Sequence, residues 1–103
     1  MRRNKYGAIK TTVDGITFHS KKEAAHYQDL KLRVRKGEIK DLILQPKFPL
    51  VINGVKCGSY IGDFEYVEGG RRVIVDVKGV KTPVYNLKKK LVKAVHGVEV
   101  VEI

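Results

Sequence analysis

The sequence predicts a mixed α/β fold, an α+β arrangement in which helices flank one mixed sheet, and three observations lead to it. A Gly-Gly pair separates two runs rich in aromatic and β-branched residues, which is typical of a hairpin with strands over 60–67 and 72–78. A serine-capped amphipathic segment predicts a helix over about 21–36. A second capped helix over 83–96 leads to a last strand over 98–102, which makes a β-α-β unit with two parallel strands.

The length and charge of the chain limit which folds and partners are plausible. A chain of 103 residues with 43% hydrophobic residues predicts one domain, 1–103, with a basic arm over 1–10. Lysine and arginine number 21 against 11 aspartate and glutamate, which gives a formal net charge of +10. This excess favours a polyanionic partner, with nucleic acid first and an anionic membrane surface second.

Several classes of site and location are disfavoured. Cys57 is the one cysteine, which excludes an intrachain disulfide and a zinc site built from a cysteine cluster. The three histidines lack the spacing of metal ligands. No apolar run reaches the length of a membrane span, and no apolar segment follows the basic start as it would in a signal peptide. The expected location is therefore the cytoplasm.

The first half of the chain predicts a small hairpin and then the first helix. Strands over 11–13 and 16–18 flank an Asp-Gly turn. Ser20 is a favourable N-cap, and Gly37 is a typical stop after the last turn. Helical spacing then places four side chains on one face: Glu23, Tyr27, Leu30 and Val34.

Glu23 has two interpretations. It stands three residues after Ser20, the spacing of a capping box, in which its carboxylate serves only the start of the helix. It also opens an otherwise apolar stripe and so points toward the edge of the core, where it would join the carboxylates of Asp63 and Asp76. The residues alone leave both interpretations open.

The middle of the chain predicts extended structure. An extended segment over 39–45 stops at Pro46, and a strand over 48–52 turns at Asn53-Gly54 into a return over 55–57. Gln45 and Lys47 flank the proline, where they contact substrate or serve as ordinary strand-end residues. Whether Gln45 or His19 assists a site is open at this point.

The central hairpin carries the candidate site. With the Gly-Gly pair as a two-residue turn, Asp63, Asp76 and Lys78 share one face of the hairpin. Two carboxylates that face each other either raise a pKa or hold a cation, and Mg²⁺ typically takes one or two carboxylates beside a phosphate. Lys78 is then placed to meet a phosphate oxygen or an attacking water. The predicted pairs are Val67 with Arg72, Glu65 with Ile74, Asp63 with Asp76, and Ile61 with Lys78.

A plainer interpretation of this hairpin stays open. Asp63 and Asp76 are then solvated residues of the outer face, and Lys78 neutralises one of them. A register shifted by one residue would also separate the two carboxylates.

The second predicted helix, over 83–96, has an apolar face and a basic face. Thr82 is its N-cap and Pro83 its first residue. Val84, Leu87, Leu91 and Val95 form the apolar stripe. A tyrosine among lysines on the other face suits a nucleic-acid backbone, although an ordinary solvated lysine face is an alternative. The basic arm over 1–10 could likewise contact phosphates or be a frayed, solvated terminus. The predicted DNA-binding residues are Arg2, Arg3, Lys5, Lys81, Tyr85, Lys88, Lys89 and Lys93.

These patterns together resemble a known superfamily. Four stretches, S-K-K-E-A, L-Q-P-K-F, Y-I-G-D-F and V-D-V-K-G, are similar to the PD-(D/E)xK nucleases, in particular to small phage-encoded members predicted to be Holliday-junction-resolvase-like. The resemblance spans most of the chain. It implies a restriction-endonuclease-like αβββαβ core with a mixed central sheet flanked by helices. One departure is that Gly62 rather than proline precedes Asp63, a position that many members relax.

The resemblance also implies roles for individual residues. Asp63 and Asp76 would bind Mg²⁺ or Mn²⁺ together with the backbone carbonyl of Val77, and Glu23 would complete the shell directly or through water. Lys78 would orient or activate the water and stabilise the charge of the reacting phosphate. The implied activity is metal-dependent hydrolysis of DNA phosphodiester bonds.

The leading expectation is an endonuclease selective for branched DNA that acts as a homodimer, because paired cuts on a two-fold junction need two matched sites. If the protein is phage-encoded, it acts in the host cytoplasm. The alternatives are a restriction-like or nicking endonuclease and a basic DNA-binding protein without catalysis. A membrane-surface protein is disfavoured because neither predicted helix combines a bulky apolar face with a basic flank.

Overall fold

A computed structural model describes residues 10–77 and 81–103. Three predicted arm residues (Arg2, Arg3 and Lys5) and the predicted catalytic Lys78 lie outside this part of the chain. The chain forms two compact units, Met1–Glu38 and Ile39–Ile103, and each is described by itself. The expectation of one domain over 1–103 stays a prediction.

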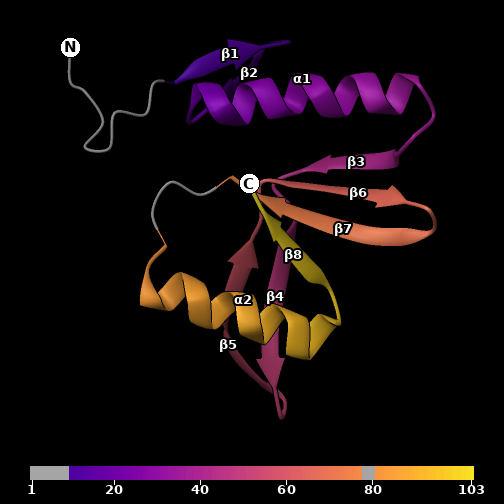
Figure 1. The fold of residues 1–103 in the computed structure, drawn as a ribbon. Helices are drawn as coiled ribbons and strands as arrows, with labels where there is room; N and C mark the ends of the chain where they lie inside the picture. The colour runs from indigo at the N-terminus through magenta and orange to yellow at the C-terminus, as the bar shows by residue number, and fades with distance from the viewer. Residues whose placement is uncertain (1–9, 78–80) are drawn as a thin grey trace, which may run out of the picture. The chain divides into compact units, whose positions relative to one another are not determined.

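The described residues contain two helices and eight strands, which confirms the predicted mixed α/β class (Figure 1). The first unit holds β1 (Thr11–Val13), β2 (Ile16–Phe18) and α1 (Lys21–Arg35). The second holds β3 (Lys40–Leu44), β4 (Lys47–Ile52), β5 (Val55–Ile61), β6 (Phe64–Glu68), β7 (Arg71–Asp76), α2 (Pro83–His96) and β8 (Glu99–Glu102).

Both helices begin at the predicted caps. The Ser20 hydroxyl accepts a hydrogen bond from the Glu23 amide at 3.1 Å, and the Thr82 hydroxyl accepts one from the Tyr85 amide at 3.1 Å. Each bond satisfies a backbone donor that has no partner within its own helix. Gly97 ends α2 in the left-handed conformation (φ 68°), as its glycine predicts.

In the first unit, α1 packs against the hairpin of β1 and β2. Glu23, Tyr27 and Leu30 are buried along one face of the helix, as predicted. The rings of Tyr27 and Phe18 lie 5.0 Å apart between centroids, which joins the helix to the hairpin. Val34 is 39% exposed, so the buried stripe ends one turn earlier than predicted.

The second unit is built on a mixed sheet with the strand order β3-β6-β7-β8. β6 is antiparallel to β3 and β7, and β8 is parallel to β7, as the β-α-β prediction requires. The predicted pairs Val67–Arg72 and Glu65–Ile74 are confirmed. Counting only the strands of this sheet, the order along the chain from α1 onward is α-β-β-β-α-β.

One predicted strand is divided in two. Residues 60–67 do not form one strand, because Tyr60 and Ile61 end β5 and pair with β4, and β6 begins only at Phe64. The predicted extension of the central hairpin to Ile61 is therefore wrong, since Ile61 pairs with Lys47. The return strand predicted over 55–57 is correspondingly longer.

Gly62 forms the step between β5 and β6. Its N–H donates to the Pro46 carbonyl at 3.0 Å, a bond that a proline at position 62 could not make. A Cβ atom at this position would lie 2.9 Å from Cγ2 of Ile74, which is closer than real Cβ contacts. Close packing and this hydrogen bond therefore favour glycine over proline at position 62.

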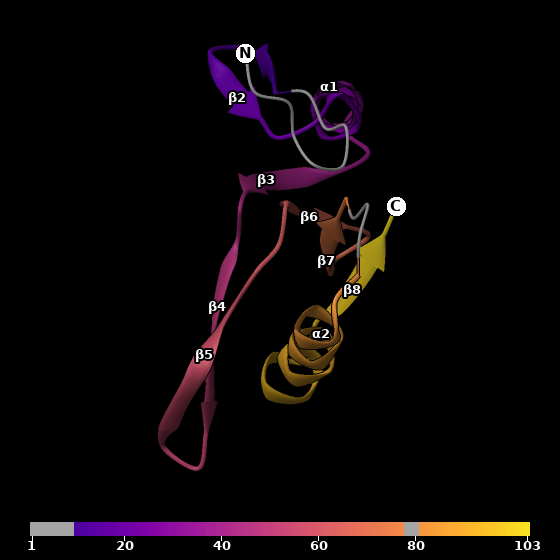
Figure 2. The ribbon, with the colours of Figure 1, turned by 90° about the vertical axis from the view of Figure 1, so that its left-hand side faces the viewer.

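The core of the second unit joins α2 to both sheets. Figures 1 and 2 show α2 beside the β4–β5 hairpin, and the two pack together. The imidazole of His96 lies 2.7 Å from the Pro49 carbonyl, which ties the end of the helix to β4. The buried residues of this core are Phe48, Leu50, Tyr60, Ile74, Val92 and Val98.

The face of α2 that packs differs from the predicted one. Val84 and Leu87 are 62% and 56% exposed, and Val95 is also exposed, whereas Val92 is fully buried. Tyr85, seven residues before Val92, lies on the same side of the helix and packs against the core. Of the predicted stripe, Leu91 does pack against the core. The rest of the packing face was missed because it includes Tyr85, whose hydroxyl has its partner on β8. Within the described ranges, neither helix is long and apolar enough to cross a membrane.

Candidate functional site

Asp63 is held at the entrance of β6 by three hydrogen bonds. Its N–H donates to the Val75 carbonyl and its own carbonyl accepts from the Gln45 N–H, both at 3.0 Å. Its carboxylate oxygen Oδ2 accepts from the Val77 N–H at 2.7 Å. Gln45 has a positive φ of 51°, an uncommon conformation for a residue with a side chain, and this turn brings its amide to Asp63. The backbone of Gln45 therefore helps to position Asp63.

Asp76 is the last residue of β7 and is fully buried. The hydroxyl of Tyr60, which is 2% exposed, donates a hydrogen bond to its Oδ2 atom. The Asp76 carbonyl accepts from the Ile103 N–H at 3.0 Å, so β8 fixes the backbone on the other side. Because a buried carboxylate is costly to keep in a fold, its presence points to a function.

The two aspartates meet at one end of the hairpin. The regular ladder ends at Phe64 and Val75, so the predicted pair of Asp63 with Asp76 is not part of it. Asp63 instead bonds to the two neighbours of Asp76, through its N–H to the Val75 carbonyl and through its carboxylate to the Val77 N–H. Burial raises the pKa of Tyr60 above its usual range, and the hydrogen bond and charge of Asp76 and the charge of Asp63 add to this effect. Both carboxylates therefore lie near one hydroxyl. Of the two, Asp63 is the more exposed, being half-buried.

The donors at this point suit a hard divalent cation. Among the residues that the structure describes, no three Asp, Glu, His or Cys side chains form a group that could hold a metal ion. Mg²⁺ needs fewer, because it usually keeps several waters and combines one or two carboxylates with substrate phosphate. The side chains of Asp63 and Asp76 and the carbonyl of Val77 offer only oxygen atoms, which fits Mg²⁺ or Mn²⁺.

Glu102 lies directly beside Asp76. The two residues are partners in the parallel register of β7 and β8. The Glu102 carboxylate accepts from the Tyr85 hydroxyl at 2.8 Å and lies 3.0 Å from Nζ of Lys89 and 3.2 Å from Nζ of Lys81. These bonds, with Lys89 first and Tyr85 next, lower the pKa of Glu102 to about 2.

Three of the four predicted DNA-binding side chains of α2 have partners on β8. Tyr85 and Lys89 bind Glu102, and Lys93 lies 2.9 Å from the Glu99 carboxylate. Lys88 is half-buried. Asn86, Lys89, Lys90, Lys93, Glu99 and Val100 surround a hollow of about 500 Å³ between α2 and β8. This basic hollow keeps a role in DNA binding as a prediction, with Glu102 and Glu99 holding two of its lysines.

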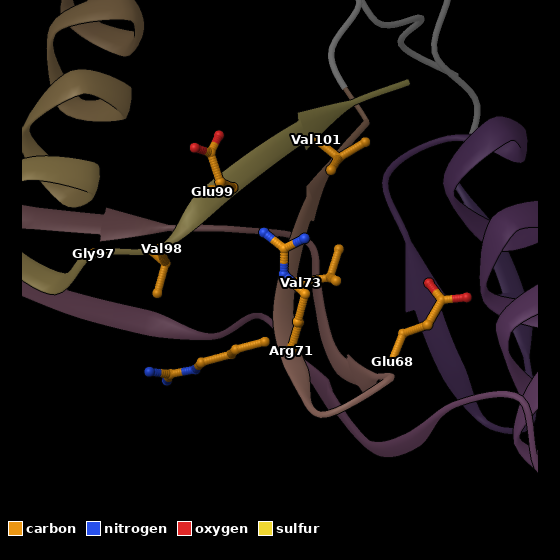
Figure 3. Close-up of a pocket in the computed structure, with 8 residues that line it drawn as sticks. Glu68, Arg71, Val73, Gly97, Val98, Glu99 and Val101 are labelled. Atoms are coloured by element: carbon orange, nitrogen blue, oxygen red, sulfur yellow. The ribbon is translucent and has the colours of Figure 1, made fainter.

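A second hollow, of about 570 Å³, lies at the opposite end of β7 and β8 (Figure 3). It is lined by Arg71 and Val73 of β7 and by Glu99 and Val101 of β8, so it does not include Asp63 or Asp76. Nearby, the Arg72 guanidinium forms two hydrogen bonds with the buried Glu65, at 2.9 and 3.3 Å. The chemistry of the aspartates is therefore not associated with this hollow.

Glu23 belongs to the first unit. It is 7% exposed, and its amide makes the capping bond to Ser20. Its predicted place beside Asp63 and Asp76 concerns the other unit and stays a prediction. The predicted phosphate contacts of Arg2, Arg3 and Lys5 and the catalytic role of Lys78 stay predictions in the same way.

The sequence patterns did not identify two residues of this site, Tyr60 and Glu102. Tyr60 lies three residues before Asp63, but its role depends on the break at Gly62 that turns β5 away from β6. Glu102 had a usable signal, because the predicted parallel strands 72–78 and 98–102 bring their carboxyl ends together. Asp76 and Glu102 both stand at those ends.

Comparison with known proteins gives one finding. A family model described as "Protein of unknown function (DUF1064)" matches residues 3–100. No curated protein matches the chain significantly, and no solved structure does either.

Proposed function

Because the chain belongs to the DUF1064 family, whose description assigns no function, we propose a function from its own residues: a metal-dependent DNA endonuclease that hydrolyses phosphodiester bonds. The observation that carries the proposal is that Asp63 bonds to both neighbours of the fully buried Asp76, Val75 and Val77, at one end of the β6–β7 hairpin. The similarity of the four sequence stretches to PD-(D/E)xK nucleases supports it, and so does the α-β-β-β-α-β order.

The carboxylates would bind the metal from fixed positions. Asp63 is held by its backbone on both sides, and its carboxylate accepts from the Val77 N–H, which fixes the peptide between Asp76 and Val77. Asp76 would supply the second carboxylate. A bound Mg²⁺ or Mn²⁺ polarises the phosphate and lowers the pKa of bound water.

Lys78 would supply the positive charge at the reacting phosphate. It follows Asp76 by two residues, and in this role it orients the attacking water and stabilises the negative charge that grows in the transition state. Glu23 is proposed as a further acidic residue that binds the metal directly or through water. Both roles come from the resemblance of this chain to the nucleases.

DNA binding would rest on the positive charge of the protein. A net charge of +10 attracts DNA without reading its sequence. The lysines between α2 and β8 lie beside the strand end that carries Asp76, because Lys81 and Lys89 bind Glu102, the register partner of Asp76. A phosphate backbone that follows these lysines would therefore pass next to the aspartates.

Branched DNA is the proposed substrate, and a homodimer the proposed active form. A chain of 103 residues has little room for a separate sequence-reading domain, which favours recognition of DNA shape and backbone. Two matched cuts on a two-fold junction need two sites, which a dimer with two-fold symmetry supplies.

Cleavage of branched, nicked and linear DNA, with and without Mg²⁺, tests the proposal. We expect Mg²⁺-dependent cleavage that is strongest on branched DNA and is lost in Asp76→Asn. Glu99→Gln is the matched control, because it also changes a carboxylate of this sheet to an amide but lies at the other end of β8. DNA binding without cleavage under every metal condition would instead identify a DNA-binding protein without catalysis.

A further inference from the structure

Tyr60 connects two parts of the second unit at the proposed metal site. It is the second-to-last residue of β5, where it pairs with Phe48 of β4, whereas Asp76 ends β7 in the four-stranded sheet. The hydroxyl of Tyr60 donates to Oδ2 of Asp76 across this junction.

The surroundings of Tyr60 allow its ring little freedom. The residue is 2% exposed and belongs to the core cluster with Phe48 and Ile74. A Cβ atom at Gly62 would lie 3.6 Å from Cε2 of Tyr60, so the step between β5 and β6 packs against this ring. A hydroxyl on a ring packed in this way has a fixed position, and so does the carboxylate oxygen that it binds.

We propose that Tyr60 is a positioning residue that holds the Asp76 carboxylate in the orientation needed to bind the catalytic metal ion. This inference rests on the proposed nuclease function. A tyrosine hydroxyl is a neutral donor, so it orients the carboxylate without cancelling its charge. Groups that hydrogen-bond to metal ligands in this way typically change metal affinity or activity by about 10- to 100-fold when they are removed.

Tyr60→Phe tests the inference because it removes only the hydroxyl. The direct readout is binding of Mn²⁺ to the DNA-free protein, measured by titration calorimetry. We expect the dissociation constant for Mn²⁺ to rise about tenfold. Affinity for uncleaved branched DNA without metal should stay the same, and excess Mn²⁺ should restore much of the cleavage rate.

Tyr66→Phe is the matched control. Tyr66 is also buried, but it lies within β6 opposite Val73, away from the strand ends beside which Asp63 and Asp76 stand. We expect its Mn²⁺ affinity to match that of the wild-type protein. Equal weakening in the two variants would mean that any lost buried hydroxyl disturbs the fold, which would overturn the specific role of Tyr60.

A second measurement covers the case in which Tyr60→Phe folds poorly. In the wild-type protein, the hydroxyl proton of Tyr60 should give a slowly exchanging NMR signal that shifts when Mg²⁺ binds. If Mg²⁺ binds and the signal does not shift, the inference is wrong while the nuclease proposal stands. If the wild-type protein binds neither Mn²⁺ nor Mg²⁺, the proposed function itself fails.

Discussion

Asp76 and Glu102 are neighbours on parallel strands, and each accepts a hydrogen bond from a tyrosine, yet their surroundings differ. Asp76 is fully buried and bound by Tyr60. Glu102 is only partly buried, and in addition to Tyr85 it binds two lysine ammonium groups. The neutral hydroxyl orients the Asp76 carboxylate and leaves its charge in place. The Glu102 carboxylate is instead paired with the two lysine ammonium groups that it holds. The difference is consistent with the metal binding that we propose for Asp76, whereas Glu102 places lysines.

The largest expected effect comes from Asp76→Asn. Loss of the carboxylate should lower Mg²⁺-dependent cleavage by more than about a hundredfold, because a metal ligand is removed. DNA affinity should hold or rise slightly, since negative charge is lost from a basic protein. Cleavage rate and DNA affinity are measured on one preparation. Full activity in this variant would remove Asp76 from the site and end the distinction from Glu102.

Lys78→Ala is expected to have the next largest effect, and Lys81→Ala is its control. Lys78 is assigned to the reacting phosphate, so its loss should lower the cleavage rate by about a hundredfold with little change in folding. Lys81 binds Glu102 and should affect DNA affinity rather than the rate. Single-turnover cleavage together with thermal unfolding separates these outcomes. An unfolded Lys78→Ala protein would make Lys78 structural.

Glu23→Gln tests whether the Glu23 carboxylate binds the metal or serves only the start of α1. As a metal ligand it should resemble Asp76, so the variant should melt normally without metal but cleave about tenfold or more slowly, with partial rescue by Mn²⁺. As a capping residue it should affect only the start of α1. Melting temperature and cleavage are compared in the same protein. Unchanged cleavage with a lowered melting temperature would assign Glu23 to the helix cap.

The sequence predicted the elements of this fold well because their signals are local. Ser20, Thr82 and Gly97 mark helix ends through hydrogen bonds or backbone angles within a few residues. The Gly69-Gly70 turn fixed the register that brings Asp63 near Asp76. Such signals need no knowledge of how distant segments pack.

What could not be predicted depends on contacts between distant segments. The break at Gly62 follows from packing against Ile74 and Pro46, which no local pattern reports. The buried face of α2 was missed because Tyr85 gains its partner, Glu102, only when β8 lies beside β7. The site was therefore predicted from Asp63, Asp76, Lys78 and Glu23, without Tyr60 and Glu102, which lie beside Asp76.

Glu102→Gln should have a smaller effect, and it should raise DNA affinity, whereas the loss of a lysine should lower it. It releases Lys81 and Lys89 from their carboxylate partner, so DNA affinity at low salt should rise about threefold. Cleavage at saturating DNA should change little. Fluorescence anisotropy at several salt concentrations measures the affinity, and Glu99→Gln, which releases Lys93 alone, should give a smaller rise. Loss of cleavage as severe as in Asp76→Asn would show that the two carboxylates act together.

The smallest expected effect is the acid dependence of folding that Glu102 contributes. Its folded-state pKa is lowered from the ordinary 4.5 to about 2, chiefly by the hydrogen bonds from Lys89 and Tyr85. A carboxylate with a lowered folded-state pKa contributes stability that is fully present above its unfolded-state pKa and is lost as the pH falls through its folded-state pKa. The difference in unfolding midpoint between the wild-type protein and Glu102→Gln should therefore be constant above about pH 4.5 and shrink toward pH 2. Denaturant unfolding at pH 6, 4 and 3 measures it. A difference that does not change over this range would mean that Glu102 does not bind its lysines in solution, and its contrast with Asp76 would lose its basis.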